Sequence, residues 1–223
     1  KGTISPAALG AVQYKGAVIG LPQTVKGVVM FRNKTIVAQP YAKFEDMISG
    51  AASGAGVDTA NLERGFFFSA AHLNGIGGAL MAENGDPAFN NDKGVEWVKL
   101  LNDFSKAGPA EYYTDNDVNA FKAGKVGVII DGSWNATALA EAIGKDNLVV
   151  DPWPTYGSGH LSGYVQTENI YLNADVAGDD KTAGWKFIEF FLSPEAQAML
   201  LKAGHLPAVS GVKVEDPLLA QMV

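Results

Sequence analysis

The residues of this protein that could take part in catalysis or metal binding are spread along the sequence and do not form known motifs. Its three histidines stand at positions 72, 160 and 205, and none has metal-ligand spacing to another histidine or to a carboxylate motif. The sequence contains no Gly-x-Ser-x-Gly turn, no phosphate-binding loop and no His-Glu-x-x-His motif. It also contains no cysteine, which excludes disulfides, thiolate zinc sites and cysteine nucleophiles. We therefore expect no catalytic residue, no metal and no cofactor.

Carboxylate pairs and glycine-rich segments point to structure more than to chemistry. Asp115 and Asp117 stand near a predicted helix start, where capping and the helix dipole favour acids. Asp179 and Asp180 have the same interpretation. The segment 75–78, Gly-Ile-Gly-Gly, lacks the third glycine of a dinucleotide fingerprint and fits close helix packing. A glycosidase would need two carboxylates about 5–10 Å apart in a cleft, and spacing along this chain identifies no such pair.

Trp134 is the aromatic residue whose position in the sequence best suits contact with a ligand. It follows Asp131-Gly132-Ser133 at the carboxyl end of a predicted strand, where a helix begins. Ligands of open α/β sheets bind at the carboxyl ends of strands, and an indole face can stack on a ligand. Corner packing is the alternative, and the local sequence favours neither interpretation. Trp97 and Trp185, by contrast, are predicted to lie on the buried faces of helices.

The elements that would position these residues alternate between strand and helix. Strands are predicted within 15–32 and at 125–130, 148–150 and 169–172, and helices at 92–106, 115–122, 134–143, 181–192 and 194–202. This alternation indicates an α/β fold. Of the 223 residues, 47% are hydrophobic and 18% charged, which favours a packed core, and the net charge of −7 argues against a nucleic-acid partner.

For three of the predicted helices, the sequence also indicates which residues are buried or how the helix packs. In 92–106 the apolar face is expected to contain Val95, Val98, Leu101 and Phe104, with Trp97 and Leu100 beside them. In 181–192 the predicted buried face carries Trp185, Ile188, Phe191 and Leu192. The apolar stretch 66–83 is expected to be one closely packed helix despite its glycines.

A set of motifs resembles the extracellular solute-binding proteins of the maltose-binding type. The segment 120–134, AFKAGKVGVIIDGSW, resembles the family signature A-F-x-x-G-x-x-A-M-x-x-x-G-x-W. Further segments match family motifs in the same order: YKGAVIGLP at 14–22, FRNK at 31–34, FED at 44–46, GWKFIEFFLSPEAQ at 184–197 and GHLPA at 204–208. Together they cover nearly the whole chain.

The resemblance implies a periplasmic-binding-protein-like α/β fold with two lobes. Residues 1–28 would form a first-lobe segment and hinge strand, 29–155 the second lobe, and 156–223 an incomplete return to the first lobe. Most of the first lobe and the C-terminal helices of the family would be absent. The family are receptors of ABC-type importers, so the resemblance implies no enzyme activity, binding of a sugar or oligosaccharide between the lobes, and docking on permease subunits. It implies a periplasmic or extracellular location, with a lipid anchor as an option for the full-length parent.

The resemblance also suggests ligand-binding residues. Trp134 matches the tryptophan that stacks on a sugar ring, Gly132 and Ser133 form its turn, and Phe67 falls near an aromatic residue that faces the cleft. Gln23, Thr24 and Lys26 lie on the hinge-proximal strand, where polar ligand contacts occur. Gly163, Tyr164 and Gln166 follow the return to the first lobe.

Lys26 departs from the family pattern, in which an acidic or neutral residue is usual. A surface lysine is one interpretation. A lysine that faces the cleft would instead indicate an anionic substituent on the ligand.

Two other functions remain open at this stage. One is a glycoside-active enzyme domain on the same architecture, which would need an acid pair beside Trp134. The other is a lobe that serves only in docking or assembly, because unpaired strand edges of an incomplete fold favour self-association.

Overall fold

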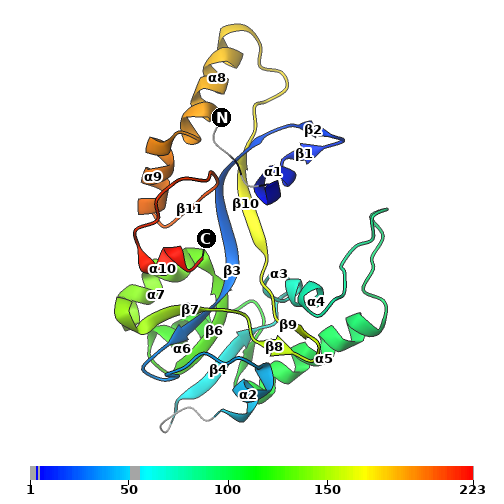
Figure 1. Ribbon diagram of the computed structural model, residues 1–223, viewed down its shortest axis with the longest axis vertical. Coiled ribbons are helices and arrows are strands. Elements are labelled where there is room, and N and C mark those ends of the chain that lie inside the picture. Colours follow the sequence, from blue (N-terminus) through cyan, green and yellow to red (C-terminus); the bar gives the residue numbers. More distant parts are fainter. Residues whose placement is uncertain (1–3, 5, 51–55, 223) are drawn as a thin grey trace. The chain divides into compact units, whose positions relative to one another are not determined.

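The computed structural model describes residues 4, 6–50 and 56–222 (Figure 1). The chain forms two compact units, unit 1 from Lys1–Gly27 and Val165–Val223, and unit 2 from Val28–Tyr164. The predicted boundaries were 28/29 and 155/156. The later second boundary follows from close packing at Gly163, where an added Cβ would lie 2.0 Å from the Val28 carbonyl oxygen within unit 2.

Unit 2 is built on a mixed β-sheet. Its order is β7–β3–β6–β4–β5, in which β3 runs antiparallel to β6 and β7 whereas β4 is parallel to β5 and β6. The strands are the second half of β3 (Leu21–Asn33), β4 (Asp58–Glu63), β5 (Ala110–Glu111), β6 (Val126–Gly132) and β7 (Leu148–Asp151), with a small hairpin of β8 (Thr155–Tyr156) and β9 (Gly159–His160). All of β6 is buried, as its continuous apolar sequence predicts.

Helices connect these strands (Figure 1). They are α2 (Phe44–Ser49), α3 (Phe66–Ser69), α4 (Ala71–Gly75), α5 (Asp92–Ala107), α6 (Asn116–Lys122), α7 (Ala136–Ile143) and the 3₁₀ turns η1 (Ser133–Asn135) and η2 (Lys145–Asn147). The main core of unit 2 packs α2 and α5 on the sheet through fully buried side chains, among them Met30, Phe44, Leu62, Phe104 and Ile130.

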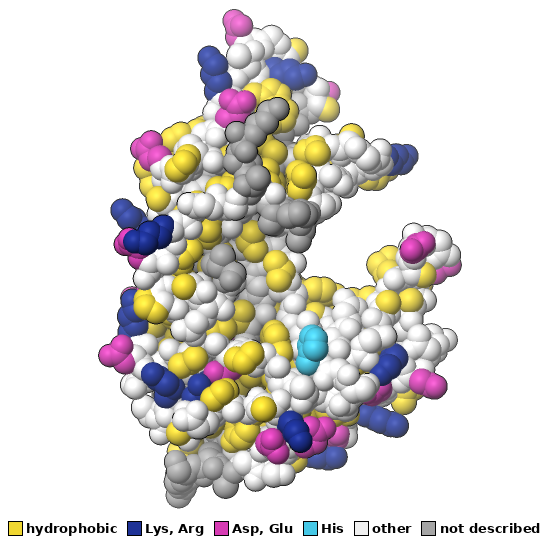
Figure 2. All heavy atoms as spheres, in the orientation of Figure 1, with side chains coloured by type: hydrophobic (Ala, Val, Ile, Leu, Met, Phe, Trp, Pro, Cys, Tyr) yellow, Lys and Arg dark blue, Asp and Glu magenta, His cyan; other side chains and the backbone are white. Residues whose placement is uncertain are grey.

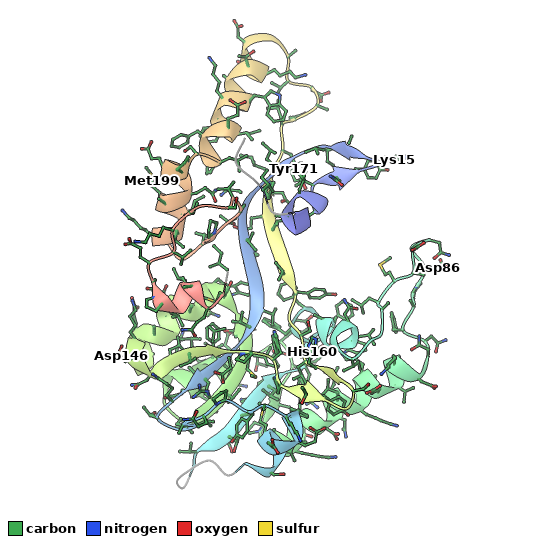
Figure 3. The ribbon with its side chains drawn as sticks, viewed as in Figure 1. Lys15, Asp86, Asp146, His160, Tyr171 and Met199 are labelled. Atoms are coloured by element: carbon green, nitrogen blue, oxygen red, sulfur yellow. The ribbon has the colours of Figure 1, made fainter. Side chains whose placement is uncertain are left out.

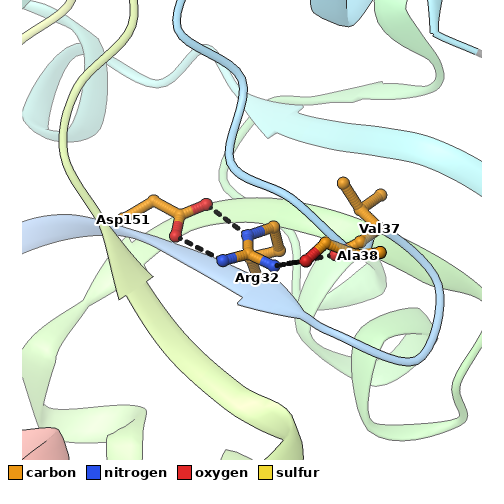
Figure 4. Close-up of polar contacts among 4 residues, drawn as sticks. All are labelled: Arg32, Val37, Ala38 and Asp151. Carbon is orange, nitrogen blue, oxygen red and sulfur yellow. Dashed lines mark hydrogen bonds and ion pairs between the residues drawn. The ribbon is translucent and has the colours of Figure 1, made fainter.

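A buried ion pair holds the end of β3 (Figure 4). The Arg32 guanidinium donates to both carboxylate oxygens of Asp151 in β7, from Nε at 2.6 Å and from Nη2 at 3.0 Å. Nη1 donates to the carbonyl oxygens of Val37 and Ala38. Both charged side chains are at most 5% exposed. The pair therefore fixes two strands and the loop after β3 in one contact.

Removing Arg32 should destabilise unit 2. In Arg32→Met the Asp151 carboxylate stays buried without its cation, so we expect a loss of about 3–5 kcal/mol in the free energy of unfolding, measured by urea unfolding. The double variant Arg32→Met/Asp151→Leu should recover much of this loss, because it removes the unpaired charge. Lys213→Met, which breaks the exposed Lys213–Glu215 pair, is the control and should leave the midpoint unchanged. A single Arg32→Met variant as stable as the parent would contradict the role of the pair.

Unit 1 combines the first half of β3 with elements from both ends of the chain. Its antiparallel partners on β3 are β10 (Val165–Ile170) and β11 (Leu206–Pro207). The other elements are α1 (Pro6–Gly10), a hairpin of β1 (Gln13–Tyr14) and β2 (Ala17–Val18), α8 (Gly178–Phe191), α9 (Pro194–Lys202) and α10 (Pro217–Ala220). Ser193 caps α9 by accepting from the Ala196 N–H, as its Ser-Pro-Glu sequence predicts.

Pro22 lies inside β3, which runs through it without a break. The register of β10 shifts between Glu168 and Asn169, where Asn169 comes opposite Pro22. Proline has no N–H to donate to the ladder. The irregularity in β10 therefore absorbs the missing hydrogen bond, and β3 continues as one long strand.

The predicted buried face of α5 is wrong in part. The buried residues are Gly94, Trp97, Leu100, Phe104 and Ala107, whereas Val95 and Val98 are 55% and 60% exposed. The two valines line a surface groove of about 640 Å³ together with Phe89. The apolar residues of α5 cover a wider part of the helix surface than β4 and α2 bury. Periodicity alone therefore predicted an adjacent face of the helix.

The prediction for α8 also differs from its packing. Ile188 is the one buried residue of α8. Trp185 is 39% exposed, and two other aromatic residues of the helix are also exposed, Phe187 at 59% and Phe190 at 44%. Figure 2 shows hydrophobic side chains open on the surface over α8 and α9, and Met199 points outward from α9 in Figure 3. Unit 1 thus leaves much of this helix pair uncovered.

The single helix predicted for 66–83 is wrong. The helical part ends at Gly75 as two short helices, and a loop follows that contains Gly77 in the left-handed region at φ 87°. The chain then forms a turn around Asn84-Gly85-Asp86, with Asp86 at its tip (Figure 3). Glycines in this run end the helix because they are free to adopt positive φ.

His72 lies in the buried interior of unit 2. His72 is fully buried, which lowers its pKa to about 3, and its Nδ1 accepts from the Ser162 N–H at 3.0 Å.

Across the part of the chain that the structure describes, no group of three or more histidines and carboxylates could hold a metal ion. No helix in that same part is long and apolar enough to cross a bilayer.

Candidate ligand-binding site

The carboxyl ends of β4, β5 and β6 meet at one edge of the unit 2 sheet. Glu63 ends β4 and pairs in register with Glu111, which ends β5. Asn61 pairs with Ile129 in β6, so Asp131 comes level with Glu63 two residues further along. Loops that leave this edge carry most of the exposed aromatic side chains of unit 2. This is the edge at which α/β sheets bind ligands.

Asp131 organises the turn that presents Trp134. Its Oδ1 accepts from the Gly132 N–H and its Oδ2 from the Asn135 side-chain amide, both at 2.7 Å. The indole lies over Gly132, where an added Cβ would come 2.1 Å from ring carbons. Trp134 remains 44% exposed. The turn therefore holds the indole at the sheet edge with much of its surface open to solvent.

Three rings form what we call the aromatic platform: Phe67, Trp134 and Tyr164. The Phe67 centroid lies 6.2 Å from that of Trp134 and 6.2 Å from that of Tyr164. These three were proposed from the sequence as ligand residues, and unit 2 brings them together from α3, η1 and the segment before β10. Adjacent rings at such distances support one another and offer an extended apolar surface.

The other proposed residues have different surroundings. Ser133 and Gly132 belong to the Trp134 turn, and Gly163 permits the close approach to Val28 described above. In unit 1, Gln166 pairs with Lys26 across β10 and β3. The Gln23 carbonyl oxygen accepts from the Gln197 side-chain amide.

Lys26 and Thr24 share one acceptor in unit 1. Lys26 Nζ forms an ion pair with Glu168 Oε1 at 2.9 Å, and Thr24 donates from Oγ1 to Glu168 Oε2 at 2.8 Å. These two contacts hold the pKa of Glu168 below its ordinary value. Thr24 is 1% exposed. Since Glu168 compensates the charge of Lys26, the lysine gives little support for an anionic ligand.

Sequence reasoning missed three residues near the platform. Phe66 is 53% exposed and packs edge-on against Trp97 with centroids 6.3 Å apart. Tyr113 is 54% exposed and its hydroxyl accepts from the Phe67 N–H. Glu63 is 3% exposed and lies beneath these loops. The run of three phenylalanines at 66–68 was a usable signal for Phe66, whereas nothing local marks Glu63 or Tyr113.

Asp117 is a buried acid of α6 close to these carboxylates. Burial is the main cause that raises its pKa to about 7, and the charges of Asp131, Glu63 and Glu111 add to the effect. Its Oδ1 accepts from the neighbouring Val118 N–H at 2.7 Å. The sequence suggested a helix cap, but Asp117 lies inside the first turn of α6 and is 3% exposed.

The raised pKa of Asp117 predicts a pH-dependent stability. The folded chain keeps the proton up to about pH 7, whereas the unfolded carboxyl loses it near its ordinary value of 3.8, so stability falls as pH rises between these values. Asp117→Asn should remove this loss and raise stability at pH 8 by on the order of 2 kcal/mol, with little gain at pH 4. Thermal unfolding of both proteins across this range measures the difference. An equal effect of the substitution at pH 4 and pH 8 would contradict the assignment.

Gly132→Ala should displace Trp134. The new methyl group would overlap the indole, so we expect a changed near-ultraviolet circular dichroism spectrum and a shifted tryptophan emission while the helical signal is retained. Gly10→Ala is the control, because an added Cβ there meets no atom within 4 Å. Identical tryptophan spectra for Gly132→Ala and the parent would show that the ring does not occupy this position.

Comparisons with known proteins agree on family and fold. The family model described as bacterial extracellular solute-binding protein matches residues 1–220. The maltotriose-binding protein of Pyrococcus abyssi is 26% identical over an alignment that covers 96% of this chain and 49% of that protein. The maltooligosaccharide ABC transporter solute-binding lipoprotein of Streptococcus pneumoniae is 27% identical, with 86% of this chain and 49% of that protein covered. The chain thus spans about half the length of these relatives.

Solved structures show the same fold. The GacH receptor of Streptomyces glaucescens, studied unliganded and with acarbose, aligns with a TM-score of 0.78 at 23% identity over 97% of this chain and 59% of that chain. A cyclo/maltodextrin-binding protein in complex with maltotetraose aligns with a TM-score of 0.78 at 21% identity over 94% and 57%. These likenesses confirm the predicted α/β, periplasmic-binding-protein-like fold in a chain that corresponds to part of it.

Proposed function

Because the chain belongs to the family of bacterial extracellular solute-binding proteins, we propose that it binds a maltooligosaccharide and hands it to an ABC-type permease. The observation that carries this proposal is the aromatic platform, with Trp134 held open at the carboxyl edge of the unit 2 sheet. The apolar face of a sugar ring stacks on such side chains. The names of the relatives, which specify maltotriose and maltooligosaccharides, favour α-linked glucose oligomers as the ligand class.

The same relationship supports a partner and a location for the protein. A permease partner is supported by the transporter named for the pneumococcal relative, and a periplasmic or extracellular location by the family description. A lipid anchor is supported by the word lipoprotein in that relative's name.

Binding without catalysis is the better supported function. Glu63 and Asp131 hold the turns that carry Phe67 and Trp134, and each accepts hydrogen bonds with both of its oxygens. Both residues are at most 5% exposed. A glycoside-active site needs an acid and a base that can reach the glycosidic bond, and neither side chain is free to do so.

Trp134→Ala tests the proposal. Titration of the chain with maltotriose, followed by calorimetry and by nuclear magnetic resonance up to millimolar sugar, should show binding that weakens at least tenfold in the variant, about 1.4 kcal/mol. Trp185→Ala removes an exposed tryptophan of α8, outside the platform, and should bind as the parent does. Equal affinity of the parent and Trp134→Ala, absence of binding by the parent, or turnover of a chromogenic glucoside would each contradict the proposal.

A further inference from the structure

Glu63 connects two loops at the carboxyl edge of the unit 2 sheet. Its side chain is 3% exposed. Oε1 accepts from the Gly65 N–H, in the loop between β4 and α3, and Oε2 accepts from the Tyr113 N–H at 2.9 Å, in the loop between β5 and α6. Hydrogen bonds to a carboxylate are stronger than those between neutral groups. A single buried side chain thus holds two segments that are 50 residues apart in sequence.

Tyr113 connects the same two loops a second time. Its hydroxyl oxygen accepts from the Phe67 N–H at 3.0 Å, and its ring lies 6.5 Å from that of Phe68. Tyr113 adopts a φ of 53°, a left-handed conformation that a bulky residue rarely takes. Gly65 leaves room for the ring, since an added Cβ there would come 2.8 Å from it. Surrounding contacts therefore hold Tyr113 in an unfavourable backbone conformation.

Both connections act on Phe67. Its backbone N–H is bound to Tyr113, and its loop begins at the glycine bound to Glu63. The Phe67 ring is the central member of the aromatic platform, between Trp134 and Tyr164. A shift of this loop would separate the rings that a ligand must meet together.

We propose that Glu63 and Tyr113 form a loop clamp that preorganises the aromatic platform for its ligand. Glu63 is a positioning residue, since it acts on the ligand only through the loops that it holds. A platform that is ordered before binding avoids the entropy lost when loops and rotamers are fixed by the ligand. This inference rests on the proposed function, because the value of the clamp is measured as sugar affinity.

Glu63→Gln breaks one half of the clamp with almost no change in volume. The glutamine oxygen still accepts one N–H, but its amide group faces the other N–H with hydrogens and cannot accept. We expect maltotriose affinity to fall about five- to twenty-fold. In the ligand-free protein, hydrogen exchange at the Gly65, Phe67 and Tyr113 amides should become faster, and the Trp134 indole resonance should move. Tyr113→Phe, which removes only the acceptor for Phe67, should change these quantities in the same direction by less.

Thr59→Val is the matched control. Thr59 is 5% exposed and donates from Oγ1 to the Gly50 carbonyl oxygen, at the opposite end of the same strand. Its substitution should lower the unfolding temperature without changing sugar affinity or the Trp134 resonance. The clamp is overturned if Glu63→Gln binds maltotriose as the parent does, or if Thr59→Val loses as much affinity for the same loss of stability.

The two proposals fail in different ways. Failure of the proposed function appears as equal binding by the parent and Trp134→Ala. Failure of the clamp appears when Trp134→Ala loses binding while Glu63→Gln and Tyr113→Phe retain it and their loop amides exchange at the parental rate. The exchange and resonance measurements need no ligand, so they test the clamp even where no sugar binds.

Discussion

The ion pair between Arg32 and Asp151 fixes the end of the strand on which both units are built. β3 pairs with β10 and β11 in unit 1 and with β6 and β7 in unit 2. A buried guanidinium must find acceptors for its hydrogens, and Arg32 finds them on β7 and on the loop after β3. These contacts fix the pairing of β3 with β7. On the other side of β3, β6 and then β4 extend the sheet toward the candidate site.

Buried acids give the carboxyl edge of that sheet its form. Asp131 holds the turn of Trp134, and Glu63 holds the loops of Phe67 and Tyr113. Each carboxylate is satisfied by neighbouring N–H groups, which is the condition for placing such a group out of water. Among the residues that the structure describes, Asp117 accepts only from the Val118 N–H, and its raised pKa reflects burial beside these charges. The same residue types that suggest hydrolytic chemistry in a sequence here serve to hold aromatic side chains in place.

Local sequence signals predicted much of this arrangement. The apolar run 126–130 indicated a buried strand and Ser193-Pro194 a helix start, and both are confirmed. The position of Trp134 after a strand and a Gly-Ser turn indicated an aromatic residue at a sheet edge, and the ordered motifs indicated the family. Helix faces were less predictable. Val95 and Val98 have the correct period for burial, but neighbouring elements cover the adjacent face of α5.

The sequence by itself determined most of the elements, the α/β class, the family and the turn that carries Trp134, because each is recognised from segments whose residues lie within a few positions of one another. Only the tertiary structure decided that Phe67, Trp134 and Tyr164 meet, that Glu168 matches Lys26, and that Glu63 reaches Tyr113. These contacts join residues from 50 to 142 positions apart. Strand order and register set which of them come together, and no local pattern encodes that choice.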